Sequence, residues 1–225
     1  MFSLNAQYLD RMAAGKVLGE NLKAKNWQEV PLILAIPNGG LAVALPLAKM
    51  LHADLDLLIV RKLQIPFNPE AGFGALTSLG TVILNQPLVN RIGLQDAEIQ
   101  QVIYRTKTQI DDRKKVYKGL VGLFSPKSRV VILVDDGLAS GYTMLAAIDS
   151  VRQLSPKRMI VAVPTASASA ISKVREQVDE LICPQVDDGV VFAVADAYEK
   201  WYDVPDEEVI MLLREYRKAK PKRKG

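Results

Sequence analysis

Residues 130–143 read VVILVDDGLASGYT, and this stretch largely decides the fold of the 225-residue chain. Its five leading apolar residues are typical of a parallel strand that is buried on both faces. They run directly into Asp135 and Asp136, whose charges are costly at the end of a buried strand unless they accept hydrogen bonds or lie near a cation. A turn of small residues follows, and a helical pattern begins at Tyr142. The stretch therefore predicts a strand, an acidic edge and a tight turn into a helix.

The remaining chain alternates short apolar runs with helical patterns. Apolar runs that predict strands occupy residues 31–36, 55–60, 82–84, 130–134, 159–163 and 180–183. Helical spacing covers residues 7–24, 41–51, 96–118, 142–154 and 166–177, and a last helix starts near Asp206. This order predicts an α/β fold, an open and mostly parallel sheet with helices on both faces. We also expect a small hood built from the terminal segments.

Residues 61–80 depart from this alternation. They contain two prolines, three glycines and little periodicity. A long irregular segment inside a compact α/β domain is usually functional or mobile. We therefore expect a functional loop here, at the carboxyl edge of the sheet where ligands bind in such folds.

Composition restricts the function classes. No apolar run approaches the roughly 18 residues that span a membrane, and the first residues lack the layout of a secretory signal. The single cysteine, Cys183, excludes an internal disulfide and offers no metal-binding spacing. The patterns GxGxxG and GxxxxGK[ST] are absent. We expect a cytoplasmic protein without membrane contact.

The net charge of +4 is concentrated at one end of the chain. Residues 214–225 hold seven Lys or Arg and one Glu, a sum of +6, so the other residues sum to −2. We therefore expect one domain over residues 1–213 and a basic, disordered tail over 214–225. The body has no basic stripe interleaved with aromatics, so nucleic-acid contact is expected at most weakly, through the tail.

The acid pair and the turn after it suit a sugar phosphate. Each of two adjacent carboxylates can accept a hydrogen bond from one hydroxyl of a ribose diol, and both can lie near Mg²⁺. Small residues let backbone N–H groups crowd around an anion, and a helix N-terminus favours negative charge. Ser140 and Thr143 add hydroxyl donors. This order of groups predicts a receptor for a ribose 5-phosphate.

The same stretch resembles the phosphoribosyl-pyrophosphate (PRPP) motif of type I phosphoribosyltransferases. By that resemblance, Asp135 and Asp136 bind the ribose hydroxyls and hold Mg²⁺, directly or through water. The turn would bind the 5′-phosphate. Its members are Gly137, Ala139, Ser140, Gly141, Tyr142 and Thr143.

Two further segments strengthen the resemblance. Asn38, Gly39 and Gly40 follow the first buried strand, where the family has its pyrophosphate loop. Arg61 and Lys62 close the second strand, where a basic pair neutralises pyrophosphate in several family members. Residues 61–80 then correspond to the family's flexible loop. The overall layout, to about residue 206, looks most like predicted phosphoribosyltransferases whose acceptor is unassigned.

The resemblance implies a Mg²⁺-dependent enzyme that moves 5-phosphoribosyl from PRPP to a nitrogenous acceptor, such as a nucleobase, and releases pyrophosphate. Its catalytic residues would be Arg61, Lys62, Asp135 and Asp136, and family precedent implies a homodimer. Ala139 stands where enzymes for 6-oxopurines usually carry an acid, which argues against hypoxanthine or guanine. The alternative is a non-catalytic regulator that binds PRPP or a nucleotide.

Two departures and one aromatic segment leave alternatives open. Asn38 stands where relatives of this layout often have Arg, and Tyr142 stands where a small residue or Lys is more usual. Residues 184–203 are rich in aromatics that either stack an acceptor ring or pack as a terminal segment or dimer contact. These aromatics are Phe192, Tyr198, Trp201 and Tyr202.

Overall fold

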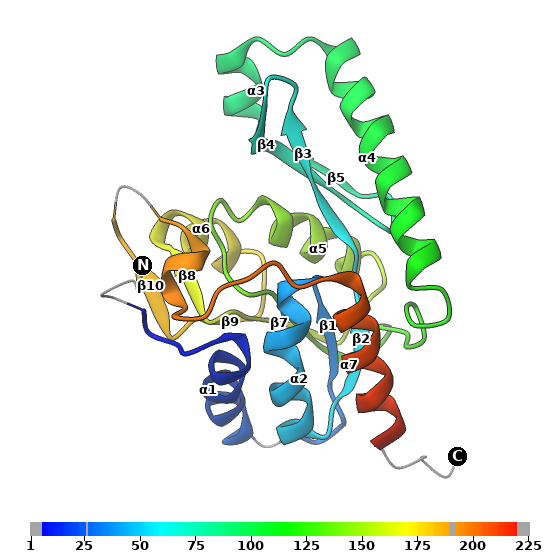
Figure 1. Ribbon diagram of the computed structural model, residues 1–225, viewed down its shortest axis with the longest axis vertical. Helices are drawn as coiled ribbons and strands as arrows, with labels where there is room; N and C mark the ends of the chain where they lie inside the picture. Colours follow the sequence, from blue (N-terminus) through cyan, green and yellow to red (C-terminus); the bar gives the residue numbers. More distant parts are fainter. Residues whose placement is uncertain (1–5, 26, 190–191, 220–225) are drawn as a thin grey trace.

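A five-stranded parallel sheet forms the centre of the fold in the computed structural model, which describes residues 6–25, 27–189 and 192–219 (Figure 1). Its strand order is β2-β1-β6-β7-β9, and every neighbouring pair is parallel. The strands are β1 (Leu32–Ala35), β2 (Asp54–Leu57), β6 (Val130–Val134), β7 (Arg158–Ala162) and β9 (Glu180–Ile182). The expected α/β fold with a mostly parallel sheet is confirmed.

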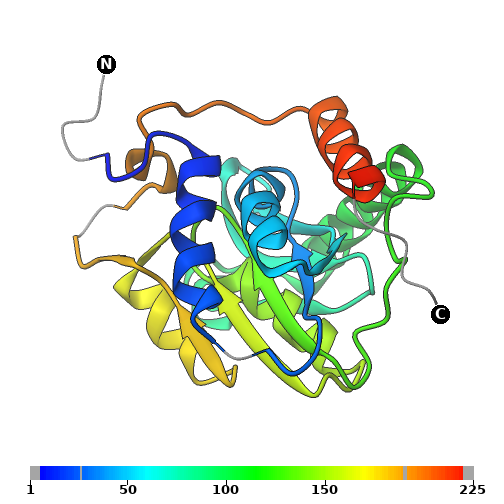
Figure 2. The ribbon, with the colours of Figure 1, turned by 90° about the horizontal axis from the view of Figure 1, so that it is seen from below.

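Helices cover both faces of this sheet, as the apolar runs predicted (Figure 2). Ile33 and Ala35 pack in the core with α1, α2 and α7, while Leu32 and Leu34 pack in a second core with α5 and α6. Alternate residues of β1 thus pack on opposite faces of the sheet. The helices are α1 (Arg11–Lys23), α2 (Gly39–Leu51), α5 (Tyr142–Arg152), α6 (Ala168–Arg175) and α7 (Asp206–Ala219).

An arm projects from one end of the sheet (Figure 1). It consists of an antiparallel sheet of order β3-β4-β5 and two helices. Its elements are β3 (Val60–Ile65), β4 (Asn68–Thr77), β5 (Val82–Leu84), α3 (Gln86–Ile92) and α4 (Asp96–Val116). The expected irregular loop over residues 61–80 is therefore wrong, because most of these residues are paired strand. The strand at 82–84 exists, but it joins this antiparallel sheet rather than the parallel one.

The glycines that suggested a loop instead allow close packing within the arm. A Cβ on Gly72 would lie 2.2 Å from Cγ of Lys62, and one on Gly74 would lie 2.3 Å from the carbonyl oxygen of Ile83. The pairing of β3 with β4 shifts register on either side of Gln64. Glycine within a strand marks such bulges and close approaches, so the composition indicated a twisted hairpin.

The terminal segments meet beside the sheet, as expected of a hood. Tyr8 and Tyr198 form a parallel bridge, and both are buried together with Ala14 and Ala197. Three short elements lie in or beside these segments: β8 (Thr165–Ser167), β10 (Gln185–Asp187), which pairs with β8, and the 3-10 helix η1 (Val194–Ala197). The arm, which the sequence did not predict, is the larger projection (Figure 1).

The expected boundary at residue 214 is wrong for residues 214–219. They continue α7, and the Tyr216 hydroxyl donates to the carbonyl oxygen of Ala53 at 2.7 Å. Nη2 of Arg217 lies 3.4 Å from the buried carboxylate of Asp56. These contacts hold the last helix on the core; residues 220–225 lie outside the described residues. Within the described ranges, no helix is long and apolar enough to cross a membrane.

Candidate functional site

The predicted acid pair and the Gly-Gly loop meet at the point where the order of the sheet reverses. The chain passes from β1 to β2 on one side and from β6 through β7 to β9 on the other. In open α/β sheets ligands bind at this switch point, beyond the carboxyl ends of the strands. The backbone N–H of Ile36 donates to the carbonyl oxygen of Val134 at 2.8 Å, so the two loops leave the sheet side by side.

Gly39 and Gly40 permit this close approach. A Cβ on Gly39 would lie 1.9 Å from Oδ2 of Asp136, and one on Gly40 would lie 3.0 Å from Cα of Asp135. Gly39 and Gly40 also form the first turn of α2, where no side-chain cap bonds the backbone N–H groups. The loop after β1 therefore places uncapped helix N–H donors next to the acid pair.

Asp135 sits in an environment that disfavours its charge. Burial, followed by the negative charge of Asp136, raises the pKa of Asp135 well above its usual range. Its Oδ1 accepts the backbone N–H of Asp136 at 2.8 Å. A cation near the pair would offset both the burial and the like-charge repulsion, so the residues fit a divalent cation with oxygen ligands such as Mg²⁺. Among the described residues, no group of three or more His, Cys, Asp or Glu could hold a metal.

Arg11 pairs with Asp136 and was not predicted from the sequence. Nε of Arg11 lies 2.8 Å from Oδ2 of Asp136, and Nη1 donates to the carbonyl oxygen of Tyr202 at 2.9 Å. The guanidinium of Arg11 lies 3.8 Å from the ring centre of Trp201, and the residue is only 5% exposed. The hydroxyl of Tyr198 donates to the backbone carbonyl of Asp136. Asp136 is thus held by α1 near the start of the chain and by Tyr198 near its end.

The turn after the acids has the form of an anion-binding loop. Ala139 and Ser140 are exposed, and Gly141 adopts a φ of +83°, a conformation that favours glycine. Gly141 caps α5, and no side chain bonds the first N–H groups of that helix. The sequence predicted that a helix begins just after the acid pair, and α5 begins there. That its N-terminus binds a phosphate stays a prediction.

Lys173 adds a positive charge beside this turn. Its Nζ lies 5.7 Å from the ring centre of Tyr142 and 3.3 Å from the carbonyl oxygen of Ser140. The unusual tyrosine therefore serves as a platform for a lysine on α6. Sequence reasoning missed Lys173 because it follows the turn by about thirty residues and no local pattern joins them.

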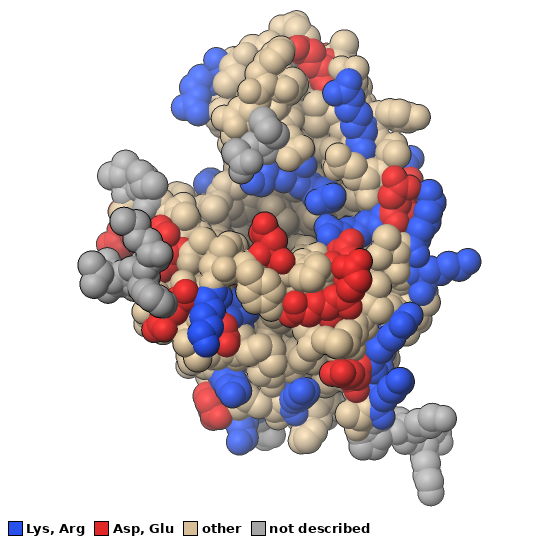
Figure 3. Space-filling model, in the orientation of Figure 1, with Lys and Arg blue, Asp and Glu red and all other residues tan. Residues whose placement is uncertain are grey.

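Arg61 and Lys62 do not close the second parallel strand, as the sequence predicted, because β2 ends at Leu57 and both residues lie in β3 of the arm. Arg61 is half-buried, and its Nε is buried without a hydrogen-bond partner. Burial, followed by the positive charge of Arg113, lowers the pKa of Arg61. Figure 3 shows basic side chains along the hollow between the arm and the core, with acidic side chains below them.

The aromatic residues near the end of the chain pack mainly around Arg11. The guanidinium of Arg11 lies within 5.9 Å of the ring centres of Tyr198, Trp201 and Tyr202. Tyr198 is buried and its ring lies 5.5 Å from that of Trp201. This arrangement favours the packing role that the sequence left open. Phe192 is half-buried, and Val190 and Val191 lie outside the described residues.

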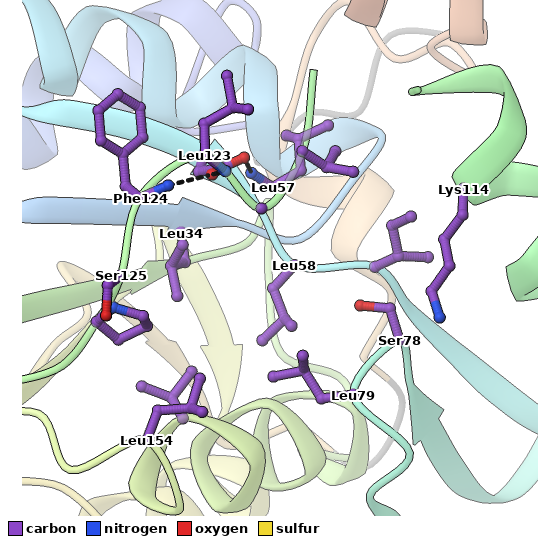
Figure 4. A pocket seen from close by; sticks show the side chains of 16 residues that line it. Leu34, Leu57, Leu58, Ser78, Leu79, Lys114, Leu123, Phe124, Ser125 and Leu154 are labelled. Carbon is purple, nitrogen blue, oxygen red and sulfur yellow. Dashed lines mark hydrogen bonds between the residues drawn. The ribbon is translucent and has the colours of Figure 1, made fainter. Parts of the chain in front are cut away.

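A separate cavity of about 690 Å³ opens beside β1 and β2 (Figure 4). Its lining is mainly aliphatic and includes Leu34, Leu58 and Leu154. The carboxylate of Asp56 there already accepts backbone N–H groups from the segment that closes the cavity. Neither acid of the pair, nor any residue of the two anion loops, lines it. The switch point, and not this cavity, carries the groups suited to a charged sugar.

Comparison with known proteins agrees with this geometry. The family model "Phosphoribosyl transferase domain" matches residues 78–200, more than half of the chain. The chain belongs to the phosphoribosyl transferase family. The matched range contains the acid pair and the turn that follows it.

Solved structures and curated proteins resemble most of the chain. TT1426 from Thermus thermophilus has 33% identity and a TM-score of 0.76, over 93% of this chain and 99% of that one. AQ2163 from Aquifex aeolicus shares the fold, with 12% identity, a TM-score of 0.51, and 79% and 74% coverage. "Putative phosphoribosyl transferase Rv0571c" of Mycobacterium tuberculosis is 31% identical over 91% of this chain. This chain spans about half of that relative's length, 46%.

Proposed function

We propose that this protein transfers the 5-phosphoribosyl group of PRPP to a nitrogenous acceptor and releases pyrophosphate. The observation that carries the proposal is the junction beyond β1 and β6, where two carboxylates lie between two uncapped helix N-termini. Such a site suits a ligand with a diol in its middle and an anion at each end. PRPP has this layout, and membership in the phosphoribosyl transferase family supports PRPP-dependent transfer in general.

Each group of the junction then has a part of PRPP to bind. Asp135 and Asp136 accept hydrogen bonds from the two ribose hydroxyls. The first turn of α5, with the hydroxyls of Ser140 and Thr143, receives the 5′-phosphate. The pyrophosphate lies against the loop of residues 38–40, with the arm's basic pair facing it. The remaining members of the 5′-phosphate site are Gly137, Ala139, Gly141 and Tyr142.

Mg²⁺ belongs to this proposal. Asp135 and Asp136 would hold it, directly or through water, together with oxygens of PRPP, because Mg²⁺ is often bound by one or two carboxylates plus substrate phosphates. When bound, the ion would supply positive charge against the pyrophosphate. The same charge would offset the burial and the repulsion by Asp136 that raise the pKa of Asp135.

The reaction exchanges one bond at C1 of the ribose for another. The C1–O bond to pyrophosphate breaks, its electron pair stays on the pyrophosphate oxygen, and a C1–N bond forms to the acceptor. The acceptor nitrogen then loses its proton to solvent. Arg61 and Lys62 stabilise the negative charge that grows on the leaving group, which is the largest electrostatic change in the step. Positioning of the two reactants supplies much of the remaining acceleration.

The acceptor is a small nitrogenous molecule in this proposal, and a nucleobase is the leading class. Ala139, which is exposed beside the turn, gives no carboxylate to a 6-oxopurine. We also propose a homodimer in the cytoplasm. Light scattering of the purified chain tests the dimer, since a monomer would show half the expected mass.

The test combines PRPP, Mg²⁺ and a panel of nucleobases and follows the release of pyrophosphate. The wild type should release it with at least one acceptor, and Asp135→Asn with Asp136→Asn should abolish the release. The chain offers a matched control in another pair of adjacent aspartates, Asp187→Asn with Asp188→Asn, which should keep the activity. Equal activity of the two double variants would contradict the proposed site.

A non-catalytic regulator that binds PRPP or a nucleotide is the second candidate. It is favoured by Asn38, which is uncharged and whose side chain is engaged by Val204 and Asp206. PRPP that stabilises the fold against heat without pyrophosphate release across a broad acceptor panel would support the regulator over the enzyme.

A further inference from the structure

Arg113 lies in a polar cluster that borders the loop of residues 38–40. It occupies the last turn of α4, and its Nη2 lies 2.5 Å from Oδ1 of Asp206, the first residue of α7. Nδ2 of Asn38 donates to the same Oδ1 at 2.9 Å. The cluster therefore joins the arm, the last helix and the start of α2.

Asp206 is held by three donors at one oxygen. The hydroxyl of Tyr117 donates to Oδ1 at 2.7 Å, beside the bonds from Arg113 and Asn38. Burial alone would raise the pKa of Asp206, but the hydrogen bonds from Tyr117 and Arg113 outweigh it and lower that pKa. The carboxylate thus remains charged and anchors one edge of the Arg113 guanidinium.

A second arginine, Arg61, lies on β3, which packs against α4. Arg61 is close enough for the charges of Arg113 and Asp206 to shift its pKa, and its buried Nε has no partner. Two guanidiniums and one carboxylate leave a net positive charge. An arginine has five N–H donors, and Arg113 directs one nitrogen to Asp206. The cluster therefore has positive charge and N–H donors to share with an anion.

We propose that Arg113 is a binding residue of the pyrophosphate subsite, contributed by the arm, and that Asp206 and Tyr117 position it. This inference rests on the proposed function. Asn38 brings no charge to the loop, so the positive charge at this end of the site comes from Arg113 together with Arg61 and Lys62. A planar guanidinium matches two phosphate oxygens at once, which a lysine cannot do.

The test measures binding of three ligands by calorimetry in the presence of Mg²⁺: PRPP, inorganic pyrophosphate and ribose 5-phosphate. Arg113→Gln should weaken the binding of PRPP and of pyrophosphate by about tenfold or more, as expected for a lost charge-assisted contact. The variant should leave the affinity for ribose 5-phosphate unchanged. Lys115→Gln is the matched control, because it removes a charge from an exposed residue of the same helix and should change nothing.

The outcomes separate this inference from the proposed function. A wild type that binds neither PRPP nor ribose 5-phosphate would overturn the proposed function. A wild type that binds both, with Arg113→Gln unchanged for pyrophosphate or equally weakened for all three ligands, would overturn only the role of Arg113. If Arg113→Gln does not fold, Arg113→Lys should still bind pyrophosphate several-fold more weakly and ribose 5-phosphate normally, because it keeps the charge but loses the planar fork.

Discussion

Two arginine–carboxylate pairs contact neighbouring residues of the same loop, and they are built in opposite ways. In the pair of Arg11 and Asp136, the arginine is enclosed: its face lies on Trp201, and its edges reach a carbonyl and the acid. In the pair of Arg113 and Asp206, the carboxylate collects the polar contacts, since one of its oxygens accepts three donors.

The difference shows which partner of each pair is held in place by further contacts. The enclosed Arg11 pairs with the carboxylate of Asp136, so this acid is fixed where the ribose diol is proposed to bind. Asp206, held by three donors, pairs with Arg113, so a cation is fixed at the proposed pyrophosphate end. The side-chain exposures do not separate the pairs, because the arginine is the less exposed partner in both, at 6% against 17% in the first and 16% against 29% in the second. Substitutions in each pair should therefore have different consequences.

The largest effect is expected for Arg11→Met. It leaves the charge of Asp136 without its partner in a mostly buried site, which should lower the free energy of unfolding by about 3–5 kcal/mol. Urea denaturation measures this. Lys16→Met, at an exposed position of the same helix, is the control and should be nearly neutral. Adding Asp136→Asn to Arg11→Met should recover part of the loss, and no recovery would contradict the pairing.

Gly39→Ala should have the next largest effect. It should lower the free energy of unfolding by about 3 kcal/mol, which is in the upper part of the usual range for overpacking. Its Cβ would lie 1.9 Å from Oδ2 of Asp136 and 2.8 Å from Nε of Arg11, neither of which can yield without breaking the pair. Gly19→Ala is the contrast, because its Cβ would meet the sulfur of Met50, the flexible end of a long side chain. Equal losses for the two variants would show that the first pair is not rigid.

Asp206→Asn should lower the free energy of unfolding by about 2 kcal/mol at neutral pH, because it removes charge-assisted hydrogen bonds. The folded-state pKa of Asp206 is lowered, so its contribution is present above the unfolded value of about 3.9 and is lost as the pH falls through the folded value. The difference in unfolding free energy between wild type and variant should be constant from about pH 7 to 5 and shrink below about pH 4. A difference that grows in acid would have the wrong sign.

The smallest effect is expected for Trp201→Leu, which removes the aromatic face under Arg11 and keeps an apolar side chain. The loss should be about 1 kcal/mol, within the range of cation–π contacts that are partly desolvated. Thermal unfolding of this variant and of Arg11→Met with Trp201→Leu measures the coupling. Fully additive losses would mean that the ring does not support the arginine.

The sequence predicted the part of the site that is local along the chain. Strand, acid pair, turn and helix follow one another within residues 130–143, so the residue types alone define their order and the edge they share. The loop of residues 38–40 was placed correctly for the same reason. Parallel strands end at one edge, and this brings the two loops together without further information.

The sequence could not predict the two ion pairs or the arm. Arg11 lies 125 residues from Asp136, and Arg113 lies 93 residues from Asp206, so only the folded chain joins them. Gly72 and Gly74 read as loop residues because their role, close contact with Lys62 and Ile83, depends on neighbouring strands. Arginines on helices are most often solvated, and tertiary contacts made these two exceptions.

A crystal structure with PRPP and Mg²⁺ bound tests the central claim most directly. The account predicts both ribose hydroxyls within hydrogen-bond distance of Asp135 and Asp136, the 5′-phosphate at the start of α5, and the pyrophosphate between residues 38–40 and the arm. PRPP bound elsewhere, for example in the apolar cavity beside β1 and β2, or with its two phosphate ends reversed, would contradict it.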